Sequence, residues 1–199
     1  GIYVGPSADL NLINSRVEGN SANIGGGIFF DNASLGGNIQ SSRITGNNAA
    51  NTYGGVVNAT SLLNGQVVIQ ETTIANNTAA NIGGGLGNGG AMQVRRSAII
   101  NNSAATGAGV ANSGLSGQMT IEDSTIAGNT ATALGGGIYN NTSSLTLNNV
   151  TLADNSAGAG FGGGIARGGG DTVTMARSII ANNTASSAPN CNTVINTDG

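Results

Sequence analysis

One motif recurs along the whole chain and constrains its fold more than any other feature: a bulky aliphatic residue followed three positions later by asparagine. Seven copies occur, and neighbouring copies lie 25 to 30 residues apart. A near-constant period of about 27 residues is typical of a chain that builds one coil repeatedly and stacks the copies. The asparagines of these motifs, which we call the first Asn column, are Asn20, Asn47, Asn77, Asn102, Asn129, Asn155 and Asn183.

Each repeat contains three segments that are typical of short strands. Before the motif, apolar and polar residues alternate, as in Met119-Thr120-Ile121, and this period of two predicts a strand with one buried face. A second predicted strand carries the motif aliphatic and, two residues after the asparagine, an alanine in all seven repeats, which indicates a tight inward space. These alanines are Ala22, Ala49, Ala79, Ala104, Ala131, Ala157 and Ala185.

The third predicted strand follows a glycine cluster such as Gly135-Gly136-Gly137-Ile138. Two reasons for glycine stay open here, a sharp corner with positive φ or close packing between coils. Two residues past the aliphatic of this strand, four repeats place asparagine. This second Asn column is Asn58, Asn88, Asn112 and Asn140.

The repeats predict an all-β fold, a single-stranded right-handed parallel β-helix (β-solenoid) of about seven coils with three short strands per coil. Each strand would pair in parallel with the same strand of the next coil, about 4.8 Å away. Residues 1–199 would form one domain. We expect this domain to be a segment of a longer protein, because solenoids need capped ends and neither end shows an obvious cap.

Stacking in register would turn columns of polar residues into ladders. Both Asn columns are expected to hydrogen-bond from coil to coil through their side-chain amides and to satisfy backbone groups at the corners. Glu71, Arg96 and Asp123 share one column on consecutive coils, with Arg95 beside Glu122. Alternating charges on adjacent rungs predict a salt-bridge ladder between coils at the surface.

Composition excludes several classes of function. Only 8% of the residues are charged, and the net charge is −3 with six arginines or lysines in total, so we expect no nucleic-acid partner. No apolar run is long enough to span a membrane. The chain has no histidine, so Cys191 cannot form a Cys–His nucleophile pair. We assign no catalytic, cofactor-binding or metal-binding residue, and we expect no enzyme activity and no cofactor.

The Gly-Gly-x-aliphatic and hydrophobic-x-x-Asn motifs resemble the repeats of the polymorphic outer-membrane proteins, whose passenger regions are parallel β-helices. They are also similar to the wider set of bacterial β-helix repeat proteins of cell surfaces. The aromatic residue that usually precedes x-x-Asn is aliphatic here in all seven coils, so the match is to the wider class. The resemblance implies export, an extracellular or bacterial cell-surface location, and a structural or adhesive role.

The leading functional hypothesis is a structural or adhesive rod that self-associates end to end or laterally into filaments, with surface glycans as a further partner. One alternative is a carbohydrate-binding or carbohydrate-active β-helix, whose acids would be Glu122 and Asp123. A second alternative is ice binding through outward threonines. These threonines are Thr120, Thr146 and Thr174. The longest loop, from Asn58 to Gln66, is expected to protrude most and to make a specific contact.

Overall fold

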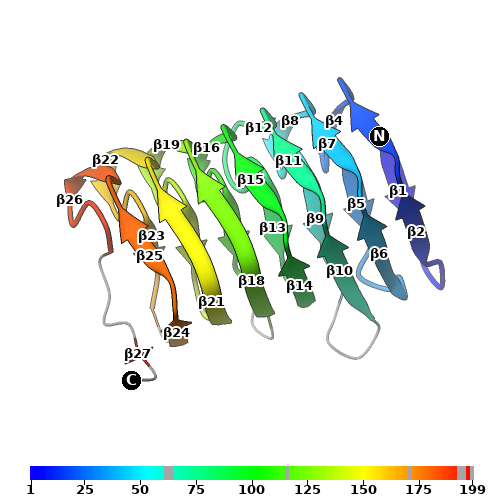
Figure 1. Cartoon of the computed structure of the whole chain (residues 1–199). Helices are drawn as coiled ribbons and strands as arrows, with labels where there is room; N and C mark the ends of the chain where they lie inside the picture. The colour runs from blue at the N-terminus through cyan, green and yellow to red at the C-terminus, as the bar shows by residue number, and fades with distance from the viewer. Residues whose placement is uncertain (61–64, 115–116, 170–171, 192–195, 198–199) are drawn as a thin grey trace.

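The computed structural model describes residues 1–60, 65–114, 117–169, 172–191 and 196–197, and within these ranges it contains strands and no helix. Three parallel sheets run the length of a β-solenoid of about seven turns, with a repeat of about 27 residues. Figure 1 shows successive coils side by side, from the blue N-terminal end to the red C-terminal end. The predicted fold class is therefore confirmed. The loop expected to protrude, Asn58 to Gln66, lies partly outside the described residues.

The three sheets divide each coil between them. Sheet A holds β1 (Ile2–Val4), β5 (Ile28–Phe30), β9 (Val56–Asn58), β13 (Leu86–Asn88), β17 (Val110–Asn112), β20 (Ile138–Asn140) and β23 (Ile165–Arg167). Sheet C holds β4 (Ser21–Ile24), β8 (Asn48–Thr52), β12 (Thr78–Ala79), β16 (Ser103–Thr106), β19 (Thr130–Leu134), β22 (Ser156–Phe161) and β26 (Thr184–Ser187).

Sheet B is the largest sheet, and most coils contribute two short strands to it. Its first half holds β2 (Leu10–Ile13), β6 (Gly36–Gln40), β10 (Gln66–Gln70), β14 (Ala91–Arg95), β24 (Thr172–Ala176) and β27 (Asn196–Thr197). Its second half holds β3 (Arg16–Glu18), β7 (Arg43–Thr45), β11 (Thr73–Ala75), β15 (Ala98–Ile100) and β25 (Ile179–Ala181). The ten-residue strands β18 (Gln118–Ala127) and β21 (Ser144–Ala153) run through both halves.

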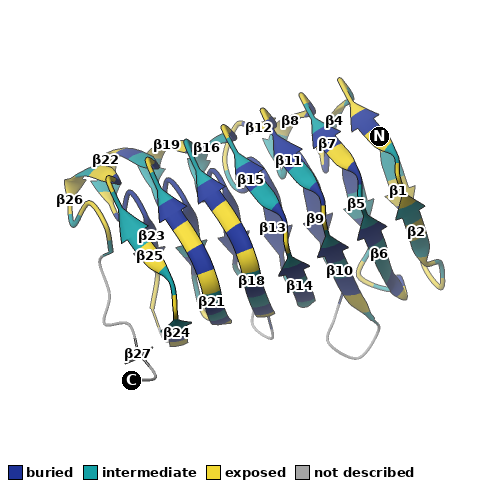
Figure 2. Cartoon of the chain, in the orientation of Figure 1, coloured by how far each residue is buried: buried dark blue, intermediate teal, exposed yellow. Residues whose placement is uncertain are grey.

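The repeat columns become rungs in register. Ile99 pairs with Ile126, and Thr146 pairs with Thr174, on neighbouring parallel strands. Buried and exposed bands alternate along β18 and β21, as Figure 2 shows. The inward aliphatic side chains of sheets A and B form one continuous core. Because every coil buries its apolar face only against its neighbours and this shared core, the stack is stabilised as a unit.

The division between the strands differs from the prediction in one respect. The motif aliphatic and the alanine column do not share a strand, because the chain turns between them and the alanines face inward from sheet C. The turn is made by the residue before each first-column asparagine, which has positive φ in every coil. Glycine, asparagine and aspartate tolerate this left-handed conformation best. These residues are Gly19, Gly46, Asn76, Asn101, Gly128, Asp154 and Asn182.

Both explanations of the glycine clusters hold, at different positions. The first glycine makes a left-handed corner, with φ of +71° at Gly83 and +63° at Gly135. The third glycine allows close approach of the next coil: a Cβ at Gly85 would lie 2.6 Å from the carbonyl oxygen of Gly109 and 2.9 Å from Nδ2 of Asn102. These distances are too short for a methyl group, so a side chain there would push the coils apart.

Replacing Gly85 with alanine should therefore destabilise the protein by about 1–3 kcal/mol through overpacking, measured by urea denaturation. The matched control is Gly89→Ala, because a Cβ at Gly89 would meet nothing closer than the Asn58 carbonyl oxygen at 3.4 Å. This control should change the free energy of unfolding by less than about 0.5 kcal/mol. Equal losses in the two variants would contradict the close-approach explanation.

Candidate functional site

The first Asn column lies inside the rod and forms a continuous hydrogen-bonded ladder. Asn102 represents the pattern. Its Oδ1 accepts from the backbone N–H of Asn77 at 2.9 Å and from Nδ2 of Asn77 at 3.1 Å. Its own Nδ2 donates to Oδ1 of Asn129 at 3.0 Å and to the carbonyl oxygen of Ile74 at 3.1 Å. Two donors reach the oxygen and two acceptors meet the nitrogen, so the buried amide is fully satisfied.

The same bonds join every step of this column. Asn20 begins the ladder in the first coil and donates to Asn47. At the other end, Nδ2 of Asn183 donates to Oδ1 of Asn190 at 3.2 Å. Asn190 was not predicted as a member of the ladder; its Oδ1 takes the place of the acceptor that the next coil supplies at the other steps. Its signal in the sequence is weak, because it lies outside the repeat motif.

The second Asn column forms a shorter ladder at the end of the sheet A strands. Its three links, from Asn58 to Asn88, to Asn112 and to Asn140, have N···O distances of 3.1, 2.9 and 2.7 Å. All four residues are buried. Phe30 occupies the same rung position in the preceding coil and is also buried. The column changes there from a polar ladder to the apolar core.

A third ladder, which was not predicted from the sequence, consists of serine and threonine hydroxyl groups. Thr72 Oγ1 accepts from the backbone N–H of Ser42 at 3.2 Å, and Ser97 Oγ accepts from that of Thr72 at 3.1 Å. Each hydroxyl also donates to a carbonyl oxygen two residues earlier, as in Ser97 to Arg95. The signal was present, because six of seven repeats place serine or threonine two positions before the motif aliphatic. The column is Ser15, Ser42, Thr72, Ser97, Ser124, Val150 and Ser178.

The predicted charge ladder forms only in part. Arg96 pairs with Glu71 at 2.9 Å, and Arg95 pairs with Glu122 at 2.9 Å. The expected third rung is wrong, because Asp123 accepts instead from Nδ2 of Asn149 at 2.7 Å. The Arg96 guanidinium directs both Nε and Nη2 to Oε1 of Glu71 on the preceding coil. The result is two separate ion pairs at the surface rather than a continuous ladder.

This charged column also marks a bend in sheet B. Positive φ values occur at Ser41, Glu71, Arg96, Asp123 and Asn149, between +44° and +55°. Glutamate and arginine are not typical of this conformation, so the bend was not predicted from the residue types at this column. The bend separates the two halves of sheet B in most coils. Polar side chains at this junction, such as Ser41 and Glu71, line a cleft in the surface.

Glu71 is the best-held carboxylate of this column. Hydrogen bonds from Arg96 and then from Ser41 lower its pKa below the ordinary value for glutamate. The charge of Glu71 is therefore kept at pH values where a free glutamate begins to take up a proton. The side chain remains exposed to solvent, so this interaction serves local geometry more than overall stability.

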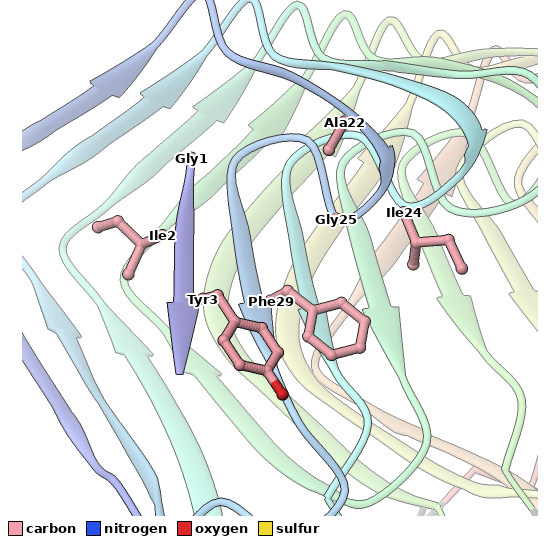
Figure 3. A pocket seen from close by; sticks show the side chains of 7 residues that line it. All are labelled: Gly1, Ile2, Tyr3, Ala22, Ile24, Gly25 and Phe29. Carbon is pink, nitrogen blue, oxygen red and sulfur yellow. The ribbon is translucent and has the colours of Figure 1, made fainter. Parts of the chain in front are cut away.

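An apolar pocket of about 360 Å³ lies at the first coil. Figure 3 shows Tyr3 and Phe29 side by side in this pocket, with Ile2, Ala22 and Ile24 around them. The two rings stack with centroids 5.7 Å apart, and Tyr3 is 64% exposed. The Tyr3 hydroxyl donates to Asp31 at 2.9 Å, which raises the pKa of the tyrosine. The lining offers aromatic contact area and one phenol.

The residues singled out for other chemistry do not form a shared centre in the described part of the chain. Glu122 and Asp123 bond to different partners, Arg95 and Asn149. No group of three or more metal-ligating side chains gathers among the described residues. The backbone of Cys191 forms a parallel bridge with Ile165 at the end of sheet A, and the partly buried cysteine packs against the core.

The threonines proposed for ice binding lie on neighbouring strands of sheet B in register and are half-buried. They are Thr120, Thr146 and Thr174. Among the described residues there is no helix of the length and apolarity needed to cross a membrane.

Comparison with known proteins gives no assignment: no family model, curated protein or solved structure matches the chain. The resemblance of its repeats to bacterial surface proteins therefore stays a prediction.

The buried ladder predicts a large cost for Asn102→Ala. Removing this amide leaves the backbone N–H of Asn77 without its acceptor in the core and takes one donor from the carbonyl of Ile74, so the free energy of unfolding should fall by about 3 kcal/mol or more. Asn81→Ala is the matched control, because its amide makes the same kind of inter-coil bond, to Asn51 at 2.7 Å, on the exposed surface. Chemical denaturation should find less than about 0.5 kcal/mol there. Similar losses would contradict the burial argument.

The corrected charge pairing makes a separate prediction. Carboxyl NMR titration of Arg96→Gln should find the Glu71 pKa raised toward the ordinary value, whereas Asp123→Asn should leave it unchanged. Because the folded-state pKa is lowered, the contribution of Glu71 to stability is present above its unfolded pKa and is lost as pH falls through the folded value. A change of the Glu71 pKa in Asp123→Asn would contradict the pairing seen in the structure and would support a ladder of Glu71, Arg96 and Asp123.

Proposed function

We propose that the protein is a structural rod of the bacterial cell surface or the extracellular space, with an adhesive outer wall. One observation carries this proposal: the polar residues that the sequence repeats most regularly are used in the interior to hold neighbouring coils together. Asn77, Asn102 and Asn129, for example, are at most 1% exposed and bond to one another across three coils. Such residues support a scaffold rather than a reaction.

The ladders favour a stiff rod. An amide buried without partners is costly, so each coil must stay in register to keep the amides of its neighbours satisfied. A shift of one coil would break bonds in both Asn columns and in the hydroxyl column together. The stack therefore resists bending and slipping, which suits a spacer that holds an adhesive surface away from a cell.

The outer face of sheet C supports lateral self-association. None of its strands contains a charged residue, and its outward column carries small polar side chains. Thr78, Thr130 and Thr184 are exposed there, and no bond within the described structure uses their hydroxyls. Two such faces can approach closely without charge repulsion, and each hydroxyl can both donate and accept.

Two measurements test this function. Antibodies against the rod should label intact producing cells or their medium, and negative-stain microscopy of the purified protein should find straight rods gathered side by side or end to end. Thr130→Arg should loosen the side-by-side contacts by placing a charge on sheet C, whereas the control Thr125→Arg, on the exposed face of sheet B, should not. Labelling only after permeabilisation would overturn the location, and single rods at all concentrations would overturn self-association.

A further inference from the structure

A polar cleft of about 460 Å³ lies at the bend of sheet B in the first three coils. Residues of three consecutive coils line it, so the register of the stack positions them. The lining residues are Asn14, Ser15, Arg16, Ser41, Ser42, Arg43 and Glu71. The amide and hydroxyl ladders use none of the charges of this cleft, and the proposed scaffold role does not use the charge of Arg43.

Two arginines stand on adjacent rungs at one side of this cleft. Arg16 and Arg43 are register partners on β3 and β7, on strands about 4.8 Å apart. Like charges directly opposite each other on neighbouring strands are unfavourable. Arg16 is compensated by Glu18 at 2.6 Å. The guanidinium of Arg43, by contrast, has neither an ion pair nor a hydrogen bond in the described structure.

The carboxylate across the cleft does not neutralise Arg43. Glu71 is held by Arg96 at 2.9 Å and by the hydroxyl of Ser41 at 3.0 Å. The side-chain amide of Asn14 also lacks a partner among the described residues. The one hydrogen bond that Asn14 donates, to the carbonyl oxygen of Gln40, comes from its backbone N–H. The cleft thus presents an open cation and an open amide beside an ionised carboxylate.

We propose that this cleft binds a carboxylate-bearing sugar unit of an acidic polysaccharide. The Arg43 guanidinium would take the sugar carboxylate in a two-pronged hydrogen bond. Asn14 would bond the ring hydroxyls, and the remaining lone pairs of Glu71 would accept from them. The inference rests on the proposed function, because it names a ligand for the adhesive wall.

The charges of the cleft select this ligand class over other anions. A single unpaired guanidinium balances the one negative charge of a carboxylate. A phosphate dianion would keep a second negative charge, which the ionised Glu71 would repel. A uronic acid carries one carboxylate and several neutral hydroxyls, which match one cation and a set of polar acceptors and donors. The cleft is open to solvent, so the chain of a polymer can extend beyond it.

Calorimetric titration of the purified protein with oligogalacturonate and with hyaluronan oligosaccharides tests the proposal. At least one of them should bind, and Arg43→Gln should weaken that binding at least tenfold, because one charge-assisted, two-pronged contact is lost. The fully methyl-esterified oligogalacturonate, which lacks the charge, should bind as weakly as the variant does. Arg43→Lys should restore part of the affinity, since it keeps the charge without the planar fork.

Arg177→Gln is the matched control, because Arg177 is exposed on the same side of the rod in the last coils and bonds to Asn148 instead. It should leave the affinity unchanged. The ligand assignment is overturned if neither oligosaccharide binds, if Arg43→Gln binds as the parent does, or if inorganic phosphate competes with equal affinity. Any of these results leaves the scaffold role standing, because cell labelling and microscopy test that role separately.

Discussion

The buried amide-to-amide hydrogen bond between neighbouring coils is the interaction on which the rest of the structure depends. It fixes the distance and register between coils, and the residues of two other columns leave room for the amide and direct it inward. The third glycine of each cluster lies against this amide: a Cβ at Gly55 would be 3.1 Å from Nδ2 of Asn77. The left-handed residue before each asparagine aims the amide inward. Glycine, corner and asparagine therefore form one unit that every coil repeats.

Sequence reasoning reached the architecture because a solenoid repeats its physical constraints in every coil. The period, the aliphatic core and both Asn columns were all visible as columns. The path of the chain between columns was less visible: sheet B and sheet C meet at a corner made by residues such as Asn76 and Asp154, which also occur in ordinary loops. The bend at Glu71 and Arg96 had no signal, because backbone context rather than residue type produces it. Of the predicted charge pairs, Arg96 with Glu71 and Arg95 with Glu122 form, but the rung from Arg96 to Asp123 does not, since side-chain direction does not follow from register alone.

Polar side chains in the interior of the rod have a different role from those on its surface. The amides of the two Asn columns and the hydroxyls of the Ser/Thr column hold the stack, whereas the hydroxyls of Thr78, Thr130 and Thr184 on the outside of sheet C form no bond within the described residues. The few charges gather on sheet B and near the bend, where most are paired and Arg43 is not. A rigid rod with a neutral face and a polar face can pack against copies of itself on one side. It can meet a charged polymer on the other side without disturbing its core.

Amide hydrogen exchange followed by NMR tests the central claim most directly. The backbone N–H groups of Asn77, Asn102 and Asn129 donate to side-chain oxygens of the next coil rather than to backbone carbonyls. If the amide ladder holds the coils together, these three groups should exchange as slowly as the most protected amides of the sheet B core, through opening of the whole stack. Exchange at the fast rate of exposed loop amides would show that the ladder opens locally, and it would contradict the account.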